Sequence, residues 1–444
     1  MNIVFYSSSS NNFSASDTKL TTYPRRSDCL DELAEEYPEY NFSVVTQLPA
    51  SFICDLDFGK INPKSKKVFY HLVDSTSTQD FVNIVLSQKP DLVIAMTFWI
   101  APFDWMGLKD SLIADELRKN GVDVMCHSGS AQLICFDKKN TADFLTQNNF
   151  SHPKSVYVHH EYFWAERGRK EIASNNYKDF ILSKVAQMNF PVVIKDCVGL
   201  SSYGMEVAVS YAQAVHYLKN GRNVSDRIVE EYIDGFHFGC EIYGRKGKYK
   251  ILLPLIFSLN RYGITSPKLS VKTGPVKSAD FKINELENLL QNLALALDLD
   301  GLAQVDLIFS DGKWFVVEIN PRLSGMTETY AASMGKSVFQ LMTETALGRA
   351  CDFPDLKNVC NFKLPLLCDK MLENLFLFPQ IKYVHQHEYL AAKQEREKGY
   401  CEAVLVQDSQ DSSLLESFEK LKKEFPNLFD DEASKNFDFS KILC

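Results

Sequence analysis

The sequence predicts an α/β protein in which an open parallel α/β domain comes first and a strand-rich region follows. Over residues 1–130, short apolar segments alternate with helical segments, which is typical of a parallel sheet covered by helices. Over residues 190–350, strand patterns dominate. The 444 residues are 45% hydrophobic, so the chain can fill the cores of two or three domains.

Residues 1–130 are predicted to form the first domain from buried strands and connecting helices. Its helices are residues 78–87 and 110–120, and Gly121 ends the second. The expected strands are residues 3–6, 42–45, 67–70, 90–96 and 122–125.

Two further regions follow, residues 131–350 and residues 351–444. The first is mostly helical up to residue 190 and richer in strands beyond it. Strands are expected near residues 153–158 and 403–406. Helices are expected at residues 284–297, at 330–348 with Gly348 as the end, and at 413–425 before Pro426.

Composition excludes several classes of protein. A net charge of −9 argues against nucleic-acid binding through phosphate neutralisation. The 11 scattered cysteines include no Cys-x-x-Cys pair, which favours reduced thiols over disulfides or zinc. No apolar run of 18 residues and no signal-peptide pattern occurs. We therefore expect a cytoplasmic protein without a nucleic-acid or membrane partner.

Residues 306–322 form the most informative segment, two short strands joined by Ser310-Asp311-Gly312. Glu318 and Asn320 are two residues apart, so on a strand they point to the same face. With Asp306 from the preceding strand they would offer the oxygen ligands that Mg²⁺ takes together with nucleotide phosphates. The alternative is an ordinary surface hairpin with solvated carboxylates.

The turn decides whether Asp306 shares that face. A two-residue Asp311-Gly312 turn would point Asp306 away from Glu318. A three-residue Ser310-Asp311-Gly312 loop, with Gly312 left-handed in a bulge, would restore the shared face. These residues suit both turns, and the metal interpretation predicts the three-residue loop.

Two upstream segments have features of a nucleotide site. A strand over residues 190–195 ends in Lys195, and the Gly/Ser-rich residues 197–204 follow it. Such a loop can present N–H groups to phosphates, with the lysine as a point charge. A hairpin loop with a snorkelling lysine is the alternative. The strand and turn over residues 227–235 can offer backbone groups to an adenine edge, or form an edge strand with charged flanks.

The order and spacing of these segments resemble the ATP-grasp superfamily, and the resemblance covers roughly residues 90–350. The first residue of the nucleotide pattern is Lys138, at the start of a helix. The carboxylate–amine ligases, including D-alanine–D-alanine ligases and natural-product dipeptide ligases, are the most similar members. The resemblance implies two α+β subdomains that sandwich ATP, a lid at about residues 190–235, and a C-terminal extension from residue 351.

The resemblance also implies a nucleotide site. Lysines would contact the phosphates, a mobile loop would close over them, and a strand end with apolar neighbours would hold adenine. His237 stands where the family often has a ribose-binding glutamate, with Glu241 as the alternative if the register slips. The expected ATP-binding residues are Lys138, Val193, Lys195, Ser201, Ser202, Tyr203, Gly204, Glu230, Glu231, Tyr232, Ile233, His237 and Val317.

By the same resemblance, Asp306, Glu318 and Asn320 would ligate two Mg²⁺ ions, with Mn²⁺ as a substitute. Arg322 and Lys195 would be catalytic, with Arg322 stabilising the transferring phosphoryl group. Arg322, Ser324 and Gly325 would border the substrate. Arg261 is a candidate partner for a substrate carboxylate, or else a solvated loop arginine. Residues 98–107 lack the substrate-loop motif of D-alanine ligases, which favours a bulkier or more apolar substrate.

The implied activity is an ATP- and Mg²⁺-dependent ligation of a carboxylate to an amine through an acyl phosphate, releasing ADP and phosphate. The substrates would be small molecules, amino acids or a peptide, and a homodimer stays open. One alternative is a non-catalytic ATP-binding regulatory protein, which would not need the metal carboxylates. Another is a carboxylase-type or carbamoyl-phosphate-type enzyme, for which no biotin-carrier Met-Lys motif or glutaminase region is evident.

Overall fold

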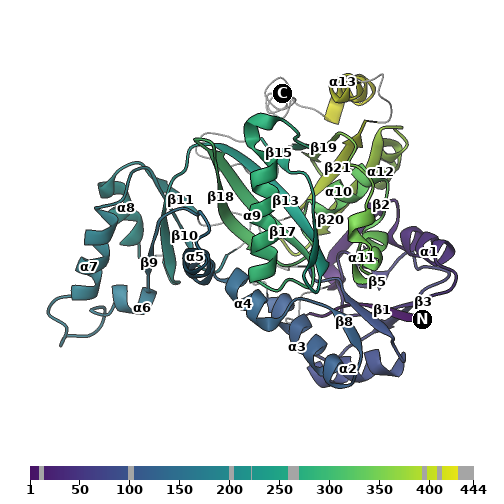
Figure 1. The fold of residues 1–444 in the computed structure, drawn as a ribbon, viewed down its shortest axis with the longest axis horizontal. Helices are drawn as coiled ribbons and strands as arrows, with labels where there is room; N and C mark the ends of the chain where they lie inside the picture. The colour runs from purple at the N-terminus through teal and green to yellow at the C-terminus, as the bar shows by residue number, and fades with distance from the viewer. Residues whose placement is uncertain are drawn as a thin grey trace.

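The computed structural model describes residues 1–9, 15–98, 105–199, 205–221, 223–258, 270–392, 398–407 and 413–428. Within these ranges the strands form three sheets, one parallel and two antiparallel. Figure 1 shows the four-stranded sheet projecting to one side of the large central sheet, with the parallel sheet below it. No helix in these ranges is both long and apolar enough to cross a membrane.

The N-terminal sheet has five parallel strands in the order β6-β3-β1-β7-β8, which confirms the predicted α/β class. Residues 3–7 of the central strand β1 are all buried, as an apolar strand covered on both faces should be. The strands are β1 (Asn2–Ser7), β3 (Asn41–Thr46), β6 (Phe69–Leu72), β7 (Leu92–Ala95) and β8 (Asp123–Met125), with helices α2 (Thr78–Ser87) and α3 (Trp105–Lys119).

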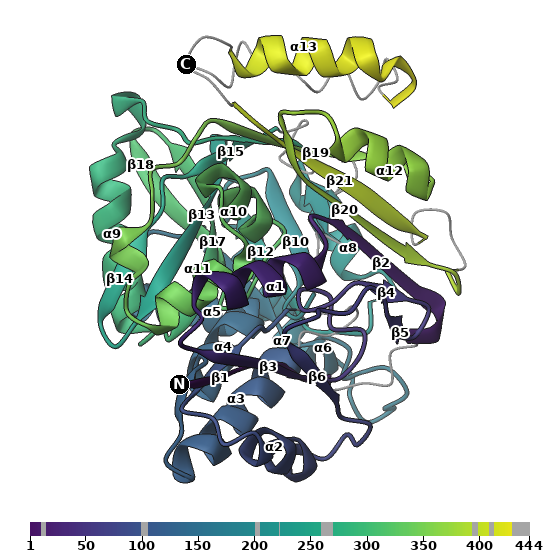
Figure 2. The same ribbon diagram turned by 90° about the vertical axis from the view of Figure 1, so that its right-hand side faces the viewer.

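Three N-terminal strands belong to the large antiparallel sheet instead. β2 (Thr18–Tyr23) pairs antiparallel with β20 (Ile381–Tyr389), and β4 (Leu56–Asp57) and β5 (Lys60–Ile61) extend the same edge. Figure 2 shows β2 beside β20, in the large sheet. The predicted domain boundaries at residues 130 and 350 remain a prediction, and the C-terminal region is completed by N-terminal strands.

The four-stranded sheet, in the order β11-β10-β12-β9, forms a small subdomain with its own apolar core. Its strands are β9 (Ser155–Val158), β10 (Val192–Asp196), β11 (Glu206–Ala208) and β12 (Arg227–Glu231). The helices before and around it are α4 (Gly129–Phe136), α5 (Lys138–Gln147), α6 (His160–Phe163), α7 (Asn176–Val185) and α8 (Tyr211–Leu218).

The large sheet has one apolar and one polar face where β13 crosses it. Phe238, Cys240 and Ile242 pack in the core under helix α9 (Ile283–Ala296), which Figure 1 shows lying across β13 and β17. The residues between them therefore point to the opposite face. The remaining strands are β13 (Phe236–Arg245), β14 (Lys248–Ile251), β15 (Leu255–Phe257), β16 (Lys272–Gly274), β17 (Gly301–Ser310), β18 (Lys313–Asn320), β19 (Val359–Leu364) and β21 (Gly399–Val406).

The single helix predicted over residues 330–348 is wrong, because the structure has two helices there, α10 (Thr327–Met334) and α11 (Val338–Ala346). Gly335, at φ +69°, ends α10 in the left-handed conformation that glycine adopts readily. Ser337 then begins α11 with a reciprocal capping box that includes Gln340. The other helices are α1 (Arg26–Glu36), α12 (Asp369–Phe376) and α13 (Leu414–Glu424), with short 3₁₀ helices at Ala15–Asp17, Ala279–Phe281, Ala350–Asp352 and Pro426–Leu428.

A buried ion pair joins the N-terminal helix α1 to α10. The Arg26 guanidinium lies against the Glu328 carboxylate, and both side chains are less than a tenth exposed. Arg26 also donates to the Tyr383 hydroxyl at 3.2 Å, and its backbone N–H donates to Asp55 at 2.9 Å. The two ends of the chain are therefore held together by charge as well as by the β2–β20 pairing.

We expect Arg26→Met to lower the free energy of unfolding by about 3–5 kcal/mol, because it leaves the Glu328 charge buried without its partner. The double variant Arg26→Met/Glu328→Leu should lose less than the single one, since no buried charge remains. Urea denaturation measures both, with Arg349→Met at an exposed site as the control. A double variant as unstable as the sum of the two single variants would contradict this account.

Candidate active site

The hairpin between β17 and β18 closes with two residues, so the predicted three-residue loop is wrong. Ser310 pairs with Lys313, which leaves only Asp311 and Gly312 in the turn. Both have positive φ angles, 49° and 71°. Two successive positive φ angles give a turn whose twist matches that of the flanking strands, and Asp-Gly is a favoured sequence for it.

A β-bulge restores the shared face instead. Leu307 pairs with Val316, but Asp306 pairs with Glu318, so Val317 is an extra residue on β18. The extra residue reverses the alternation of side chains beyond it. Asp306 and Glu318 are therefore directly opposite on one face of the sheet, as the metal interpretation required, through a device that the sequence did not reveal.

Asn320 and Gln304 complete this face. They pair directly across the two strands, and the Asn320 amide donates to Gln304 Oε1 at 2.8 Å. The Gln304 amide in turn donates to Asp306 Oδ1 at 2.7 Å. Gln304 was missed by sequence reasoning, although its position two residues before Asp306 on the same strand could have marked it.

Burial, and next the charge of Glu318, raises the pKa of Asp306 to about 6. Burial would also raise the pKa of Glu318, but the lysines Lys138 and Lys195 and then Arg322 hold it below its ordinary value. Two opposed carboxylates at this depth need cations around them.

This donor set fits a hard cation. The described ranges contain no cluster of three or more His, Cys, Asp or Glu side chains suited to a metal, so two carboxylates and amide oxygens are what the face offers. Oxygen-only ligands in small number suit Mg²⁺, which takes its remaining ligands from water and nucleotide phosphates. The repulsion between the Glu318 and Asp306 carboxylates contributes to the raised pKa of Asp306, and a bound cation would relieve it.

Two lysines from other segments reach this face. Lys138, the first residue of α5, lies 3.5 Å from Glu318 through its ammonium group and donates to the Gly199 carbonyl at 3.1 Å. Lys195 on β10 is ion-paired with Glu230 on the adjacent strand at 2.6 Å. Burial opposes the Lys195 charge, but Glu230 raises the lysine pKa above its ordinary value, with smaller effects from the carboxylates of β17 and β18.

The predicted adenine strand is β12. The Glu230 carboxylate is ion-paired with Lys195, and the Glu231 carboxylate accepts a hydrogen bond from the Asn189 backbone N–H at 3.0 Å. The backbone N–H groups of Glu231 and Tyr232 donate to Lys154 and Pro191 within the subdomain. These bonds leave the backbone N–H of Ile233, two residues after the end of β12, as the candidate for the base. Val193 and Val317 are both half-buried.

His237 and Glu241 lie on the site face of β13 but differ in environment. His237 is half-buried, burial lowers its pKa to about 4, and its Nε2 has no hydrogen-bond partner among the described residues. Glu241 is completely buried and accepts hydrogen bonds from Ser324 and Thr327 at 3.0 and 2.7 Å and from Tyr243 at 2.7 Å. Glu241 therefore holds the turn before α10, and the residue that would bind the ribose stays a prediction.

That turn carries the predicted substrate residues. Arg322 is buried and donates to Asn320 Oδ1 at 3.0 Å and to the Leu323 carbonyl at 3.2 Å. Ser324 is held by Glu241, and the Gly325 carbonyl accepts a hydrogen bond from Lys272 at 3.0 Å. Sequence reasoning also missed Lys272, which belongs to β16 and is far from the motif in the sequence.

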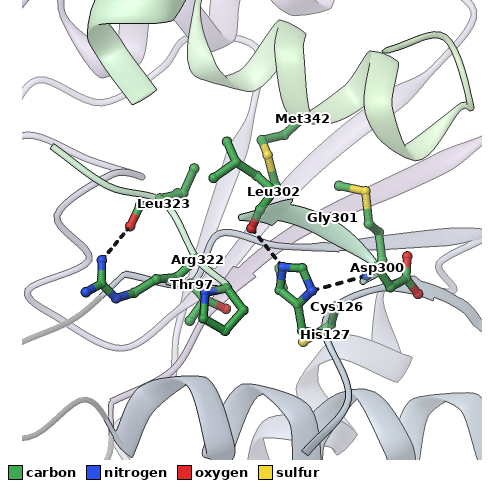
Figure 3. Close-up of a pocket in the computed structure, with 12 residues that line it drawn as sticks. Thr97, Cys126, His127, Asp300, Gly301, Leu302, Arg322, Leu323 and Met342 are labelled. Atoms are coloured by element: carbon green, nitrogen blue, oxygen red, sulfur yellow. Dashed lines mark hydrogen bonds between the residues drawn. The ribbon is translucent and has the colours of Figure 1, made fainter. Parts of the chain in front are cut away.

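A small cavity lies behind Arg322, between the ends of β7 and β8 and the start of β17. Figure 3 shows His127 on one side of it, with Arg322 extending away from it on the other. Both ring nitrogens of His127 are engaged, with the Leu302 carbonyl at 2.7 Å and the Asp300 N–H at 3.1 Å. Burial lowers the pKa of His127 to about 4, so it is a neutral structural histidine here.

Five predicted site residues lie outside the described residues. These are Ser201, Ser202, Tyr203 and Gly204 of the phosphate loop, and Arg261.

The predicted metal residues lie together with Lys138 and Arg322 in the described structure. Comparison with known proteins finds a family match over the segment that contains all of them. Residues 135–326 match the family model of the ATP-grasp domain. Over this segment, which is less than half of its length, the chain is similar to ATP-grasp domains. ATP binding is typical of such domains, and the segment contains all the predicted nucleotide and metal residues.

The fold of the chain is similar to that of solved enzymes. The L-amino acid ligase from Bacillus licheniformis superimposes with a TM-score of 0.63 at 15% identity, over 95% of this chain and 97% of that one. N5-carboxyaminoimidazole synthetase from Staphylococcus aureus, solved with ADP, gives 0.61 at 11% identity, over 95% and 96%. At these identities the similarity establishes the fold alone.

Among curated proteins, the carbamoyl phosphate synthase large chain of Thermoanaerobacter sp. (strain X514) is 23% identical over 276 residues. The match covers 61% of this chain but only 23% of that protein. The chain thus spans about a quarter of the length of this relative.

The buried Glu241 predicts a pH-dependent stability. Burial raises its pKa to about 7 in the folded protein, against an ordinary value of 4.5. The folded state therefore holds this proton more tightly, and the stability that the group contributes below pH 4.5 is lost as the pH rises through 7. In urea denaturation from pH 5 to 8, the wild type should lose stability relative to Glu241→Gln, which does not titrate. A difference between the two proteins that stays constant with pH would contradict the assignment.

Proposed function

We propose that this protein is an ATP- and Mg²⁺-dependent ligase that joins a carboxylate to an amine and releases ADP and phosphate. The observation that carries the proposal is the pair Asp306 and Glu318, directly opposed on one sheet face. The cations Lys138, Lys195 and Arg322 come from three separate segments and act on the same carboxylate. A protein that only binds nucleotide has no need of this arrangement.

Each group of site residues is proposed to bind a different part of the Mg²⁺–ATP complex. Lys138 and Lys195 hold the negative charge of the nucleotide phosphates. His237 Nε2, which has no hydrogen-bond partner within the described part of the chain, is the candidate for the ribose. Val193, Val317 and the backbone of Ile233 hold the base. Asp306, Glu318 and Asn320 hold Mg²⁺, which neutralises phosphate charge and polarises the terminal phosphoryl group when it is bound.

The reaction then needs two displacements. A carboxylate oxygen of the substrate attacks the γ-phosphorus, the bond to ADP breaks, and an acyl phosphate forms. The amine nitrogen attacks the acyl carbon, phosphate leaves with the bonding electron pair, and the nitrogen loses a proton. Arg322, fixed by Asn320 and next to Gly325, neutralises the phosphoryl group in both steps. The loop over residues 197–204 is proposed as the lid that excludes water, because an acyl phosphate hydrolyses; its residues 200–204 lie outside the described ranges.

A carboxylation-type reaction is the second candidate. It is favoured by the curated relatives, which are carbamoyl phosphate synthase large chains, and by the fold of N5-carboxyaminoimidazole synthetase. In that case bicarbonate, not an organic acid, would accept the phosphoryl group. The phosphate and metal residues would keep the same roles, so only the substrates distinguish the two reactions.

The test is ADP release with ATP and Mg²⁺, using a panel of L-amino acids singly and in pairs and, separately, bicarbonate with and without an amine. Release that depends on amino acids supports the ligase. Release that depends only on bicarbonate establishes the second candidate. ATP binding without ADP release under any of these conditions indicates the regulatory alternative, and formation of AMP and pyrophosphate would overturn the acyl-phosphate step.

Glu318→Gln should lower the rate of ADP release by about 100-fold or more, because it removes a charged metal ligand. The melting temperature should fall little, because the substitution removes the negative charge of Glu318 and with it the repulsion between this side chain and Asp306. Glu287→Gln, on the exposed face of α9, is the matched control and should keep full activity. Full activity in Glu318→Gln would refute the metal site.

A further inference from the structure

A row of polar side chains runs from the metal face toward the C-terminal strands. Lys272 on β16 is directly opposite Asn361 on β19. Two residues along β19, Lys363 is opposite Glu402 on β21, and Glu402 is opposite His385 on β20. Residues of matching parity lie on one face of the sheet, so the row continues the site face across four strands.

The far end of this row is closed by protein contacts. Lys363 is ion-paired with Glu402, and its ammonium group also lies 4.5 Å from the Tyr400 ring centre. His385 Nδ1 is 3.2 Å from the Thr22 hydroxyl. Helix α10 covers this part, where Thr329 accepts a hydrogen bond from the Asn361 amide at 2.7 Å.

Lys272, at the near end, is different. Its ammonium group is half-buried and donates one hydrogen bond, to the Gly325 carbonyl, within the part of the chain that the structure describes. An ammonium group has three N–H donors, so two remain for another partner. Gly325 is three residues after Arg322, which sets Lys272 beside the proposed phosphoryl site.

Among the described residues, Lys272 has no ion-pair partner, because the charges around it are engaged elsewhere. Lys363 is balanced by Glu402, Glu241 is occupied by three hydroxyl groups, and Asp306 belongs to the proposed metal site. Burial and then Lys363 lower the pKa of Lys272 to about 8, which agrees with a cation that has no direct counter-ion. One unbalanced positive charge matches a single carboxylate better than the double charge of a phosphate monoester.

We propose that Lys272 binds the free carboxylate of the amine-donating substrate, which would therefore be an amino acid or the N-terminal residue of a peptide. This inference rests on the proposed ligase function and names its second substrate. The carboxylate that is activated must meet the γ-phosphate beside Arg322. Lys272 instead reaches the turn from β16, where it is opposite Asn361 of β19, and contacts the turn at Gly325, three residues beyond Arg322. It can therefore hold a carboxylate that keeps its charge throughout the reaction.

The test compares the standard L-amino acids with their carboxamides as amine donors, in wild type, Lys272→Met and Lys272→Arg. Loss of a hydrogen bond to a charged group lowers affinity by about 10- to 100-fold. The wild type should prefer the amino acid by about that factor in kcat/KM, Lys272→Met should lose the preference, and Lys272→Arg should keep part of it. The KM for ATP should stay unchanged in all three.

Lys248→Met, at an exposed lysine on β14, is the matched control and should retain the preference. An unchanged preference in Lys272→Met overturns the inference while leaving the ligase function intact. A phosphorylated amine, O-phosphoethanolamine, is a further arm: a Lys272-dependent preference for it over the amino acids would overturn the carboxylate assignment.

Calorimetry separates this inference from the proposed function, because it needs no turnover. Each amino acid and its carboxamide are titrated into protein saturated with Mg²⁺ and a non-hydrolysable ATP analogue. Tighter binding of an amino acid than of its carboxamide, abolished by Lys272→Met, supports the subsite even if ADP release fails. Equal binding of the two by the wild type overturns it.

Discussion

Two carboxylates facing each other on one sheet face impose the main constraint on this protein. Asp306 and Glu318 are opposite residues of adjacent strands, and each disfavours the charge of the other. Such a pair is costly unless cations surround it. Lys138, Lys195 and Arg322 supply these cations from a helix start, a strand of the small sheet and the turn before α10. The architecture of the site can be understood as the set of connections that hold these cations in place.

Each cation is fixed by a partner of its own. Glu230 holds Lys195, the Gly199 carbonyl holds Lys138, and Asn320 holds Arg322. Glu241 fixes the Arg322 turn from beneath through two hydroxyl groups. The small sheet is thereby tied to the large one through charged side chains around a shared face, which is where the proposed function needs ATP to lie. Second partners of this kind are what give a site its geometry.

The sequence predicted the local features that depend on periodicity. Alternation of strands and helices gave the parallel sheet, and the spacing of two between Glu318 and Asn320 gave their common face. It could not predict the bulge at Val317, because Asp311-Gly312 suits two turns and the choice depends on packing along the whole hairpin. It also missed Gln304, Lys272 and the pairing of β2 with β20, since these depend on strands brought together over long sequence distances. The break at Gly335 was missed because the apolar pattern continues from α10 into α11.

The central claim is that the extra residue Val317 is what gives Asp306 and Glu318 a common face for Mg²⁺ and ATP. Deleting Val317 removes the bulge and should turn Glu318 and Asn320 toward the opposite face of the sheet. Calorimetric titration of ATP, with and without Mg²⁺, measures the consequence in the wild type and in the deletion variant, with folding checked by the melting transition. The account predicts that Mg²⁺ strengthens ATP binding in the wild type and has no such effect in a folded deletion variant. An equal Mg²⁺-dependent gain in both proteins would contradict it.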